Sequence, residues 1–207
     1  MNFFIGIPTI NRADLLNDAL HKYEKDFPDI EIFVADNGHQ NIYVGGNIRC
    51  FNMGKNLGVS ASWNFLLSKG FGLGHERGVI LNDDIYWGKT QGQIEHFIER
   101  HSDKGFMVCK KEWSAFILDK TTFDVTGGFD TRFYPAYFED NDFGFRMRLL
   151  GVKRIHSEEL DPIVYRNSMS IQKDPTLNHG FEKNRQYYIQ KWGGNPSEEK
   201  FTKPFNK

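Results

Sequence analysis

The chain has 207 residues, a length typical of one domain with a short extension. It carries 26 Lys and Arg against 27 Asp and Glu, a net charge of −1. This balance argues against a nucleic-acid coat protein or a polybasic membrane anchor, because both need an excess of cations. Cys50 and Cys109 cannot form a disulfide framework, so we expect a reducing compartment. The apolar run at residues 3–7 ends at Pro8 and is too short for a signal peptide or a membrane span. These features predict a cytoplasmic protein without nucleic-acid partners.

Strand and helix patterns alternate along the first ninety residues. Helical spacing predicts a helix at residues 12–25, with Asn11 as N-cap, and another after Gly58. Short apolar runs predict strands at 2–7, 30–35, 47–51 and 78–81. This order favours an α/β fold, with a mostly parallel central sheet flanked by helices. Ligands bind such sheets at the carboxyl ends of the strands, where Pro8-Thr9, Asp36-Asn37 and Asn82-Asp83-Asp84 fall.

The second half has a more mixed pattern. It predicts helices at 91–101, 121–125, 139–150 and 177–192, and strands at 105–109 and 114–118. We expect residues 1–195 to form a single domain. Residues 196–207 are polar and contain Pro196 and Pro204, so we expect a loosely ordered tail.

Two strand ends carry candidate binding residues. A carboxylate in Asn82-Asp83-Asp84, with oxygen donors beside it, suits Mg²⁺ or Mn²⁺ where a ligand's phosphates complete the shell. The same residue types are also typical of a solvated turn. Asp36-Asn37-Gly38 predicts either an acceptor for a nucleotide base or ribose hydroxyl, or a turn with glycine at positive φ.

Two helix starts carry further candidates. Small residues at 56–64 suit a helix N-terminus that binds phosphate, or simply a well-capped helix; neither a Walker A loop nor a Gly-x-Gly-x-x-Gly fingerprint is present. Glu139-Asp140-Asn141-Asp142 follows the aromatic segment 133–138. Acidic side chains at a helix start are stabilised by the helix dipole. Three acids within four positions also suit a general base held beside an aromatic wall.

Together these segments resemble the inverting, nucleotide-sugar-dependent glycosyltransferases of the GT-A fold, a family-2-like group with many rhamnosyl- and glucosyltransferases. The Asn82-Asp83-Asp84 segment resembles the family's Asp-x-Asp metal motif, with Asn in first place. A narrower resemblance is to small glycosyltransferases encoded by chlorella viruses, which would place the protein in the host cytoplasm. The resemblance covers nearly the whole chain and is carried by segments 4–12, 34–38, 56–58, 81–84, 114–130, 138–151 and 187–193.

The resemblance implies a GT-A, Rossmann-like domain with a nucleotide-binding half (1–90) and an acceptor-binding half (91–195). It implies transfer of a sugar from a nucleotide-diphosphate donor, UDP most commonly, to a hydroxyl of a glycan or glycoconjugate, with inversion and with Mn²⁺ or Mg²⁺. Asp140 would be the general base, with Glu139 orienting a substrate, and Asp84 would bind the metal. The donor would be held by Pro8, Thr9, Asn11, Arg12, Asp36, Lys55, Asn56, Asn82 and Asp83.

The chain departs from the family pattern at two places. Asn82 replaces an acid, which removes a charge near the metal. Many relatives place a histidine beyond the catalytic acid, whereas this chain has Arg166 there; Arg166 would grip a phosphate, or His179 would supply the metal-binding imidazole. Because sugars present apolar faces to aromatic rings, candidate acceptor residues are Trp87, Trp113, Tyr137 and Phe138.

This mechanism requires Asp84 and Asp140 to open onto a shared cavity. Two alternatives remain from the sequence. One is a catalytically silent module that binds carbohydrate or nucleotide sugar, which the Asn82 substitution keeps open. The other is a sugar nucleotidyltransferase, which would need a glycine-rich triphosphate loop where Pro8-Thr9-Ile10-Asn11 stands.

Overall fold

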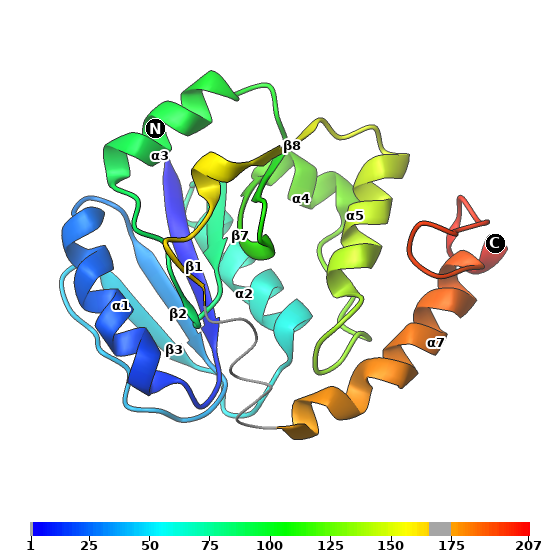
Figure 1. Cartoon of the computed structure of the whole chain (residues 1–207), viewed down its shortest axis with the longest axis horizontal. Helices are drawn as coiled ribbons and strands as arrows, with labels where there is room; N and C mark the ends of the chain where they lie inside the picture. Colours follow the sequence, from blue (N-terminus) through cyan, green and yellow to red (C-terminus); the bar gives the residue numbers. More distant parts are fainter. Residues whose placement is uncertain (1, 166–174) are drawn as a thin grey trace.

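The fold is built on a seven-stranded sheet with the order β3-β2-β1-β4-β7-β6-β8, seen in a computed structural model that describes residues 2–165 and 175–207 (Figure 1). Neighbouring strands run parallel except where β7 pairs with β4 and β6. The predicted mostly parallel sheet is therefore confirmed. In sheet order the strands are β3 (Ile48–Asn52), β2 (Ile32–Asp36), β1 (Phe3–Thr9), β4 (Arg77–Leu81), β7 (Glu112–Asp119), β6 (Phe106–Cys109) and β8 (Arg154–Ser157).

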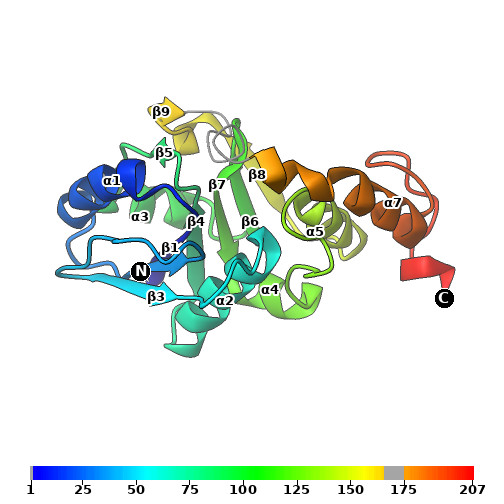
Figure 2. The ribbon, with the colours of Figure 1, turned by 90° about the horizontal axis from the view of Figure 1, so that it is seen from below.

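Helices cover both faces of the sheet (Figures 1 and 2). The helices α1 (Ala13–Asp26) and α3 (Gln91–Arg100) pack on one face. The other face is covered by α2 (Val59–Gly72), α4 (Lys120–Thr126) and α5 (Glu139–Leu149). Because both faces are covered, the central strands β1, β2 and β4 are apolar almost throughout, as expected of buried parallel strands.

The helix α7 (Phe181–Trp192) lies outside α5 and forms a third layer there (Figure 2). Phe133, Phe138 and Phe145 pack with Tyr188 and Trp192 in a separate apolar cluster. The single domain thus has a sheet core and an aromatic extension that fixes α5 from outside.

A buried ion network joins α7 to α5. The Lys191 ammonium lies 2.7 Å from an Asp130 oxygen and 2.6 Å from an Asp142 oxygen. Asp142 is fully buried and also accepts hydrogen bonds from the Trp192 indole and from Arg146. Burial acts to raise the pKa of Asp130, but hydrogen bonds from Arg132 and Lys191 outweigh it and hold that pKa below its usual range. Such pairs are costly to break from one side, so the network fixes where α5 begins.

Several boundaries differ from the sequence prediction. The helix predicted at 177–192 is divided into the 3-10 helix η2 (Pro175–Gly180) and α7. The predicted cap of α1 is also wrong: Arg12 occupies the N-cap position, and Asn11 has a left-handed φ of 55°. Two short strands that the sequence did not predict, β5 (Ile85–Tyr86) and β9 (Val164–Tyr165), pair with each other.

Residues after α7 contact the domain. The amides of Lys200 and Phe201 donate to the Trp192 carbonyl, and the Glu199 carboxylate accepts hydrogen bonds from Tyr188 and Arg148. Two further 3-10 helices, η1 (Glu158–Leu160) and η3 (Pro204–Asn206), complete the described structure. Within residues 2–165 and 175–207, no helix combines the length and apolar character needed to cross a bilayer.

Candidate functional site

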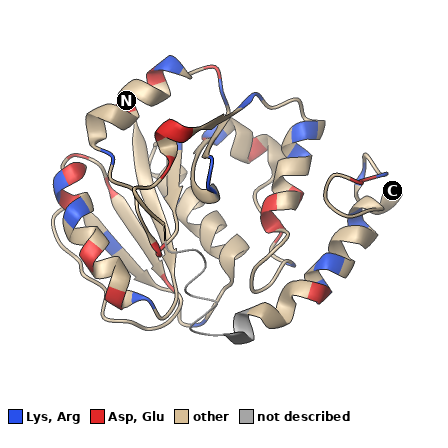
Figure 3. Cartoon of the chain, viewed as in Figure 1, with Lys and Arg blue, Asp and Glu red and all other residues tan. Residues whose placement is uncertain are grey.

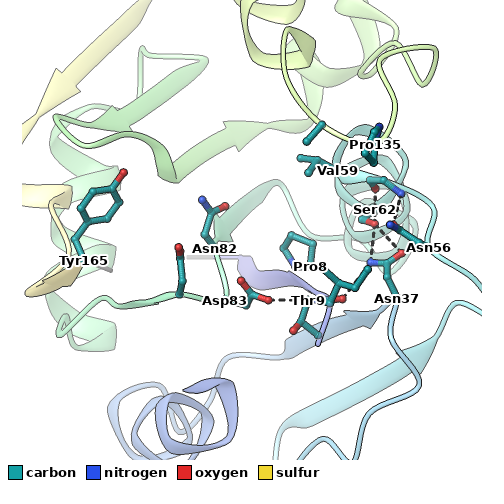
Figure 4. A pocket seen from close by; sticks show the side chains of 14 residues that line it. Pro8, Thr9, Asn37, Asn56, Val59, Ser62, Asn82, Asp83, Pro135 and Tyr165 are labelled. Atoms are coloured by element: carbon teal, nitrogen blue, oxygen red, sulfur yellow. Dashed lines mark hydrogen bonds between the residues drawn. The ribbon is translucent and has the colours of Figure 1, made fainter. Parts of the chain in front are cut away.

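A cavity of about 180 Å³ opens at the carboxyl edge of the sheet (Figure 4). We call it the first cavity. Its walls come from the ends of β1 and β4, the start of α2, the loop before α5 and the strand β9, so segments distant in sequence meet there. The lining residues are Pro8, Thr9, Ile10, Asn37, Asn56, Gly58, Val59, Ser62, Asn82, Asp83, Asp84, Pro135, Ala136 and Tyr165.

The acids that follow β4 lie in the wall of this cavity. Asp83 is 9% exposed and Asp84 is 6% exposed. The Asp83 carboxylate accepts hydrogen bonds from the Thr9 hydroxyl and from the Ile10 amide. Burial, with a smaller contribution from the charge of Asp84, raises the pKa of Asp83 to about 6 despite these hydrogen bonds and the nearby Arg12 charge. The motif is therefore a partly desolvated acidic pair, which a solvated turn would not produce.

The donor atoms in this wall fit a hard divalent cation. Asp83, Asp84 and the amide of Asn82 offer oxygen atoms together at the cavity, and Mg²⁺ typically takes one or two carboxylates and completes its shell with substrate phosphates and water. No group of three His, Cys, Asp or Glu side chains that could hold a metal occurs among the described residues. A cation bound here would accordingly depend on ligand oxygens.

Asn37 lines the first cavity, although the sequence prediction emphasised its neighbour Asp36. The Asn37 side chain donates to the Ser62 hydroxyl at 3.0 Å and accepts from the Leu57 amide at 2.9 Å, so it ties the end of β2 to α2. The Asp36 carboxylate instead accepts hydrogen bonds from the Gly38 and Gln40 amides. Asp36 is thus used inside its own turn and is not one of the described lining residues.

The other predicted donor residues divide into two groups. Pro8, Thr9 and Asn56 line the first cavity. The set outside the described lining is Asn11, Arg12 and Lys55; Asn11 and Lys55 are exposed, and the guanidinium of Arg12 is buried. Arg166 lies outside the described residues.

The start of α2 is occupied by protein groups. The Val59 amide donates to the Pro135 carbonyl at 2.8 Å, and the Ser60 hydroxyl donates to the Phe133 carbonyl at 3.2 Å. Gly58 has a φ of 79°, and a Cβ there would lie 2.8 Å from the Pro135 oxygen. The small residues therefore let the loop before α5 pack against α2, which favours the capped-helix interpretation of this segment.

Glu139 and Asp140 at the start of α5 lie in different environments. Glu139 is 6% exposed, and its Oε2 atom has no hydrogen-bond partner within the described part of the chain. Burial, followed by the charge of Asp140, raises the pKa of Glu139 well above its usual value. Asp140 is half-buried. The two neighbouring carboxyl groups therefore differ in burial, and burial raises the pKa of Glu139.

Asp140 lines a second cavity of about 180 Å³, between α5, β8 and the C-terminal segment. Asp84 lines the first cavity, so the expectation that the two acids open onto one cavity is wrong. Pro135 and Ala136, from the loop before α5, line the first cavity, and neither lines the second.

The predicted acceptor aromatics lie mainly in the protein core. Trp87 is fully buried and donates to the Leu160 carbonyl. Phe138 packs in the aromatic cluster under α7, and Tyr137 packs against that cluster. Trp113 lines the second cavity and stacks on Trp63.

His179, the predicted metal-binding imidazole, is exposed in η2. It is not among the described residues that line the first cavity with Asp84.

We compared the chain with known proteins by sequence and by structure. No protein-family model matches the chain. A galactofuranosyl glycosyltransferase from Leishmania donovani is 33% identical over 86 residues, which are 41% of this chain and 20% of that protein. The chain therefore matches only about a fifth of that relative's length.

Solved structures resemble this chain over most of its length. The mannosyltransferase PcManGT from Pyrobaculum calidifontis, in complex with GDP-Man and Mn²⁺, has a TM-score of 0.62 at 15% identity, over 88% of this chain and 63% of that one. S. aureus TarS 1–349 also has a TM-score of 0.62 at 15% identity, over 92% of this chain and 64% of that one. A Thermus thermophilus cytidylyltransferase for 2-C-methyl-D-erythritol 4-phosphate has a TM-score of 0.54 at 13% identity, over 83% and 97%. These likenesses confirm the predicted fold class, a single α/β domain of the GT-A type.

Substitution of Gly58 should test the contact between α2 and the loop before α5. Gly58→Ala places a Cβ against the Pro135 carbonyl in addition to straining a positive φ. We expect it to lower the free energy of unfolding, measured in urea, by about 1–3 kcal/mol. Gly54→Ala is the matched control, because Gly54 has a φ of 72° and nothing within 4 Å of the added Cβ. Equal losses in the two variants would contradict the contact.

Glu139→Gln should change how stability depends on pH. Because the folded pKa of Glu139 is raised, the folded state holds more protons than the unfolded state above pH ~4.3, and stability falls as pH rises through that window by at most about 1.4 kcal/mol per unit. The Gln variant removes this loss and should gain stability relative to the native protein between pH 5 and pH 8. A stability difference that stays constant across this range in urea unfolding would show that Glu139 is charged when folded.

Proposed function

We propose that the protein is a glycosyltransferase that moves a sugar from a nucleotide-diphosphate donor to a hydroxyl of a glycan or glycoconjugate. The observation that carries the proposal is the first cavity, where the buried pair Asp83 and Asp84 faces the ends of β1 and β2. Nucleotides bind open α/β sheets at this edge. The fold likeness to PcManGT, solved with GDP-Man and Mn²⁺, and to TarS supports the same donor class.

Asp84 and Asn82 would hold Mn²⁺ or Mg²⁺ together with the donor diphosphate. When bound, the cation supplies positive charge that stabilises a diphosphate leaving group. Thr9 and the Ile10 amide hold the Asp83 carboxylate in place, which orients the acidic wall. TarS has been solved with UDP, which supports UDP as the nucleotide here, together with the resemblance read from the sequence.

Asp140 is the proposed general base. A base must be ionised to accept the proton of an acceptor hydroxyl, and Asp140 is the less buried of the two neighbouring carboxyl groups. Burial raises the pKa of Glu139 well above its usual value, whereas Asp140 is only half-buried and lines the second cavity. Transfer requires the acceptor hydroxyl beside Asp140 to meet the donor sugar held beside Asp84, whereas these two acids line different cavities in the part of the chain that the structure describes. One base with in-line attack gives inversion at the anomeric carbon.

A catalytically silent nucleotide-sugar or carbohydrate-binding module is the second candidate. The separation of Asp84 and Asp140 into two cavities favours it, as does the neutral Asn82. The fold likeness to a cytidylyltransferase is compatible with a nucleotidyltransferase. However, the segment Pro8-Thr9-Ile10-Asn11 at the end of β1 lacks the glycines of a triphosphate loop. Release of nucleotide diphosphate from a panel of nucleotide sugars, with Mn²⁺ and varied acceptors, separates the enzyme from both alternatives.

Asp84→Asn tests the metal-assisted donor site. We expect the affinity for UDP- or GDP-sugars in the presence of Mn²⁺, measured by calorimetry, to fall at least about tenfold, because a carboxylate ligand becomes a neutral amide. Asp18→Asn, an exposed change on α1, is the control. Unchanged affinity in Asp84→Asn would remove this residue from the donor site.

Asp140→Asn tests the general base. We expect turnover to fall by about 10²–10⁴-fold, while nucleotide-sugar affinity stays close to native. Both quantities are measured on the same preparation, with the anomeric configuration of the product read by NMR. Full turnover in the variant, or a product that retains configuration, would contradict the assignment.

A further inference from the structure

The second cavity is lined by polar and charged residues that do not belong to the proposed donor site. It runs along one face of α5, since Asp140, Gly144 and Arg148 recur every four residues. Eight residues of helix span roughly 12 Å, so Asp140 and Arg148 lie at opposite ends of the groove. The lining residues are Phe106, Val108, Trp113, Asp140, Asn141, Gly144, Phe145, Arg148, Arg154, His156, Tyr188, Pro196, Ser197 and Glu199.

The charges in this groove are segregated. Figure 3 shows acids at the start of α5 and basic residues at its end, next to β8. Arg154 and His156 alternate along β8, so both side chains lie on the same side of the sheet. The edge position of β8 leaves both exposed toward the groove.

The two arginines differ in their partners. Arg148 donates to Glu199 at 2.8 Å, and Glu199 also accepts from Tyr188. The positive charge of Arg148 is therefore already balanced by Glu199. The guanidinium of Arg154 makes no hydrogen bond or ion pair with any residue that the structure describes, and the same holds for the imidazole of His156. Arg154 is therefore the cation of the groove that remains available to a ligand.

Aromatic and aliphatic groups form the remaining walls. Trp113 and Tyr188 both line the groove; Trp113 is half-buried and Tyr188 is fully buried. Rings of this kind pack against the apolar faces of sugars. The cavity volume of about 180 Å³ suits a small ligand such as one sugar unit better than a larger chain.

We propose that the second cavity binds a sugar unit that carries a negative group, a carboxylate or a phosphate, through Arg154 with His156 beside it. Guanidinium groups hold both anions through paired hydrogen bonds. This inference rests on the proposed function to the extent that it identifies the bound sugar as part of the acceptor. A hydroxyl of that sugar faces Asp140, while the anionic group points toward β8.

The test is an NMR titration of the ¹⁵N-labelled full chain with D-glucuronate, glucose 6-phosphate and glucose. We expect the amides of Asn141, Gly144 and His156 to shift with at least one charged sugar, and glucose to bind at least about tenfold more weakly. The two charged sugars distinguish a carboxylate from a phosphate ligand.

Arg154→Gln should abolish the preference for the charged sugar. Arg49→Gln is the matched control, because Arg49 lies on β3, the opposite edge strand of the same sheet, and it should leave the preference intact. Equal affinity for all three sugars, shifts confined to other parts of the protein, or equal behaviour of the two variants would overturn the inference.

Titration with UDP-glucose and GDP-mannose in the presence of Mg²⁺ keeps the two proposals apart. Shifts at Thr9 and Asn37 report on the first cavity. Their absence, with charge-selective binding at the groove retained, would remove the proposed donor chemistry and leave an anionic-sugar site. Their presence without charge selectivity would leave the transferase proposal standing and remove this one.

Discussion

The central constraint on this protein is the burial of parallel strands on both faces. Strands β1, β2 and β4 admit almost only apolar side chains, so polar groups can gather only where these strands end. Because the three strands are parallel neighbours, their ends meet at one edge. Thr9, Asn37 and Asp83 are brought together by this topology, and the raised pKa of Asp83 follows from the same burial.

The segments that resemble glycosyltransferases in sequence have two kinds of role in this structure. Asn82 and Asp84 face a cavity. Asp130, Asp142 and Lys191, which belong to other matching segments, instead form a buried network that positions α5. Residues in the resembling segments can therefore have a structural role as well as a place in a binding site. Here the scaffold holds the carboxyl pair Glu139 and Asp140 at the helix start, where one member is buried and the other is accessible.

The sheet and most helices could be predicted from the sequence, because the periodic spacing of apolar residues and the turn residues between elements are local signals. The edge at which Pro8-Thr9 and Asp83-Asp84 meet followed from the parallel topology. The inward use of Asp36 and the role of Asn37 could not be predicted, since they depend on which of two adjacent side chains meets α2. The placement of Asp84 and Asp140 in different cavities could not be predicted either. Like the packing of Pro135 against Gly58, it depends on contacts between distant segments that no local pattern encodes.

A crystal structure with a UDP- or GDP-sugar and Mn²⁺ examines the account most directly, because the anomalous signal of manganese locates the ion independently of the nucleotide. We predict one ion within coordinating distance of an Asp84 oxygen and of both phosphates, with the nucleoside between the ends of β1 and β2. A nucleotide bound elsewhere on the protein, or an ion that ignores Asp84, would contradict it.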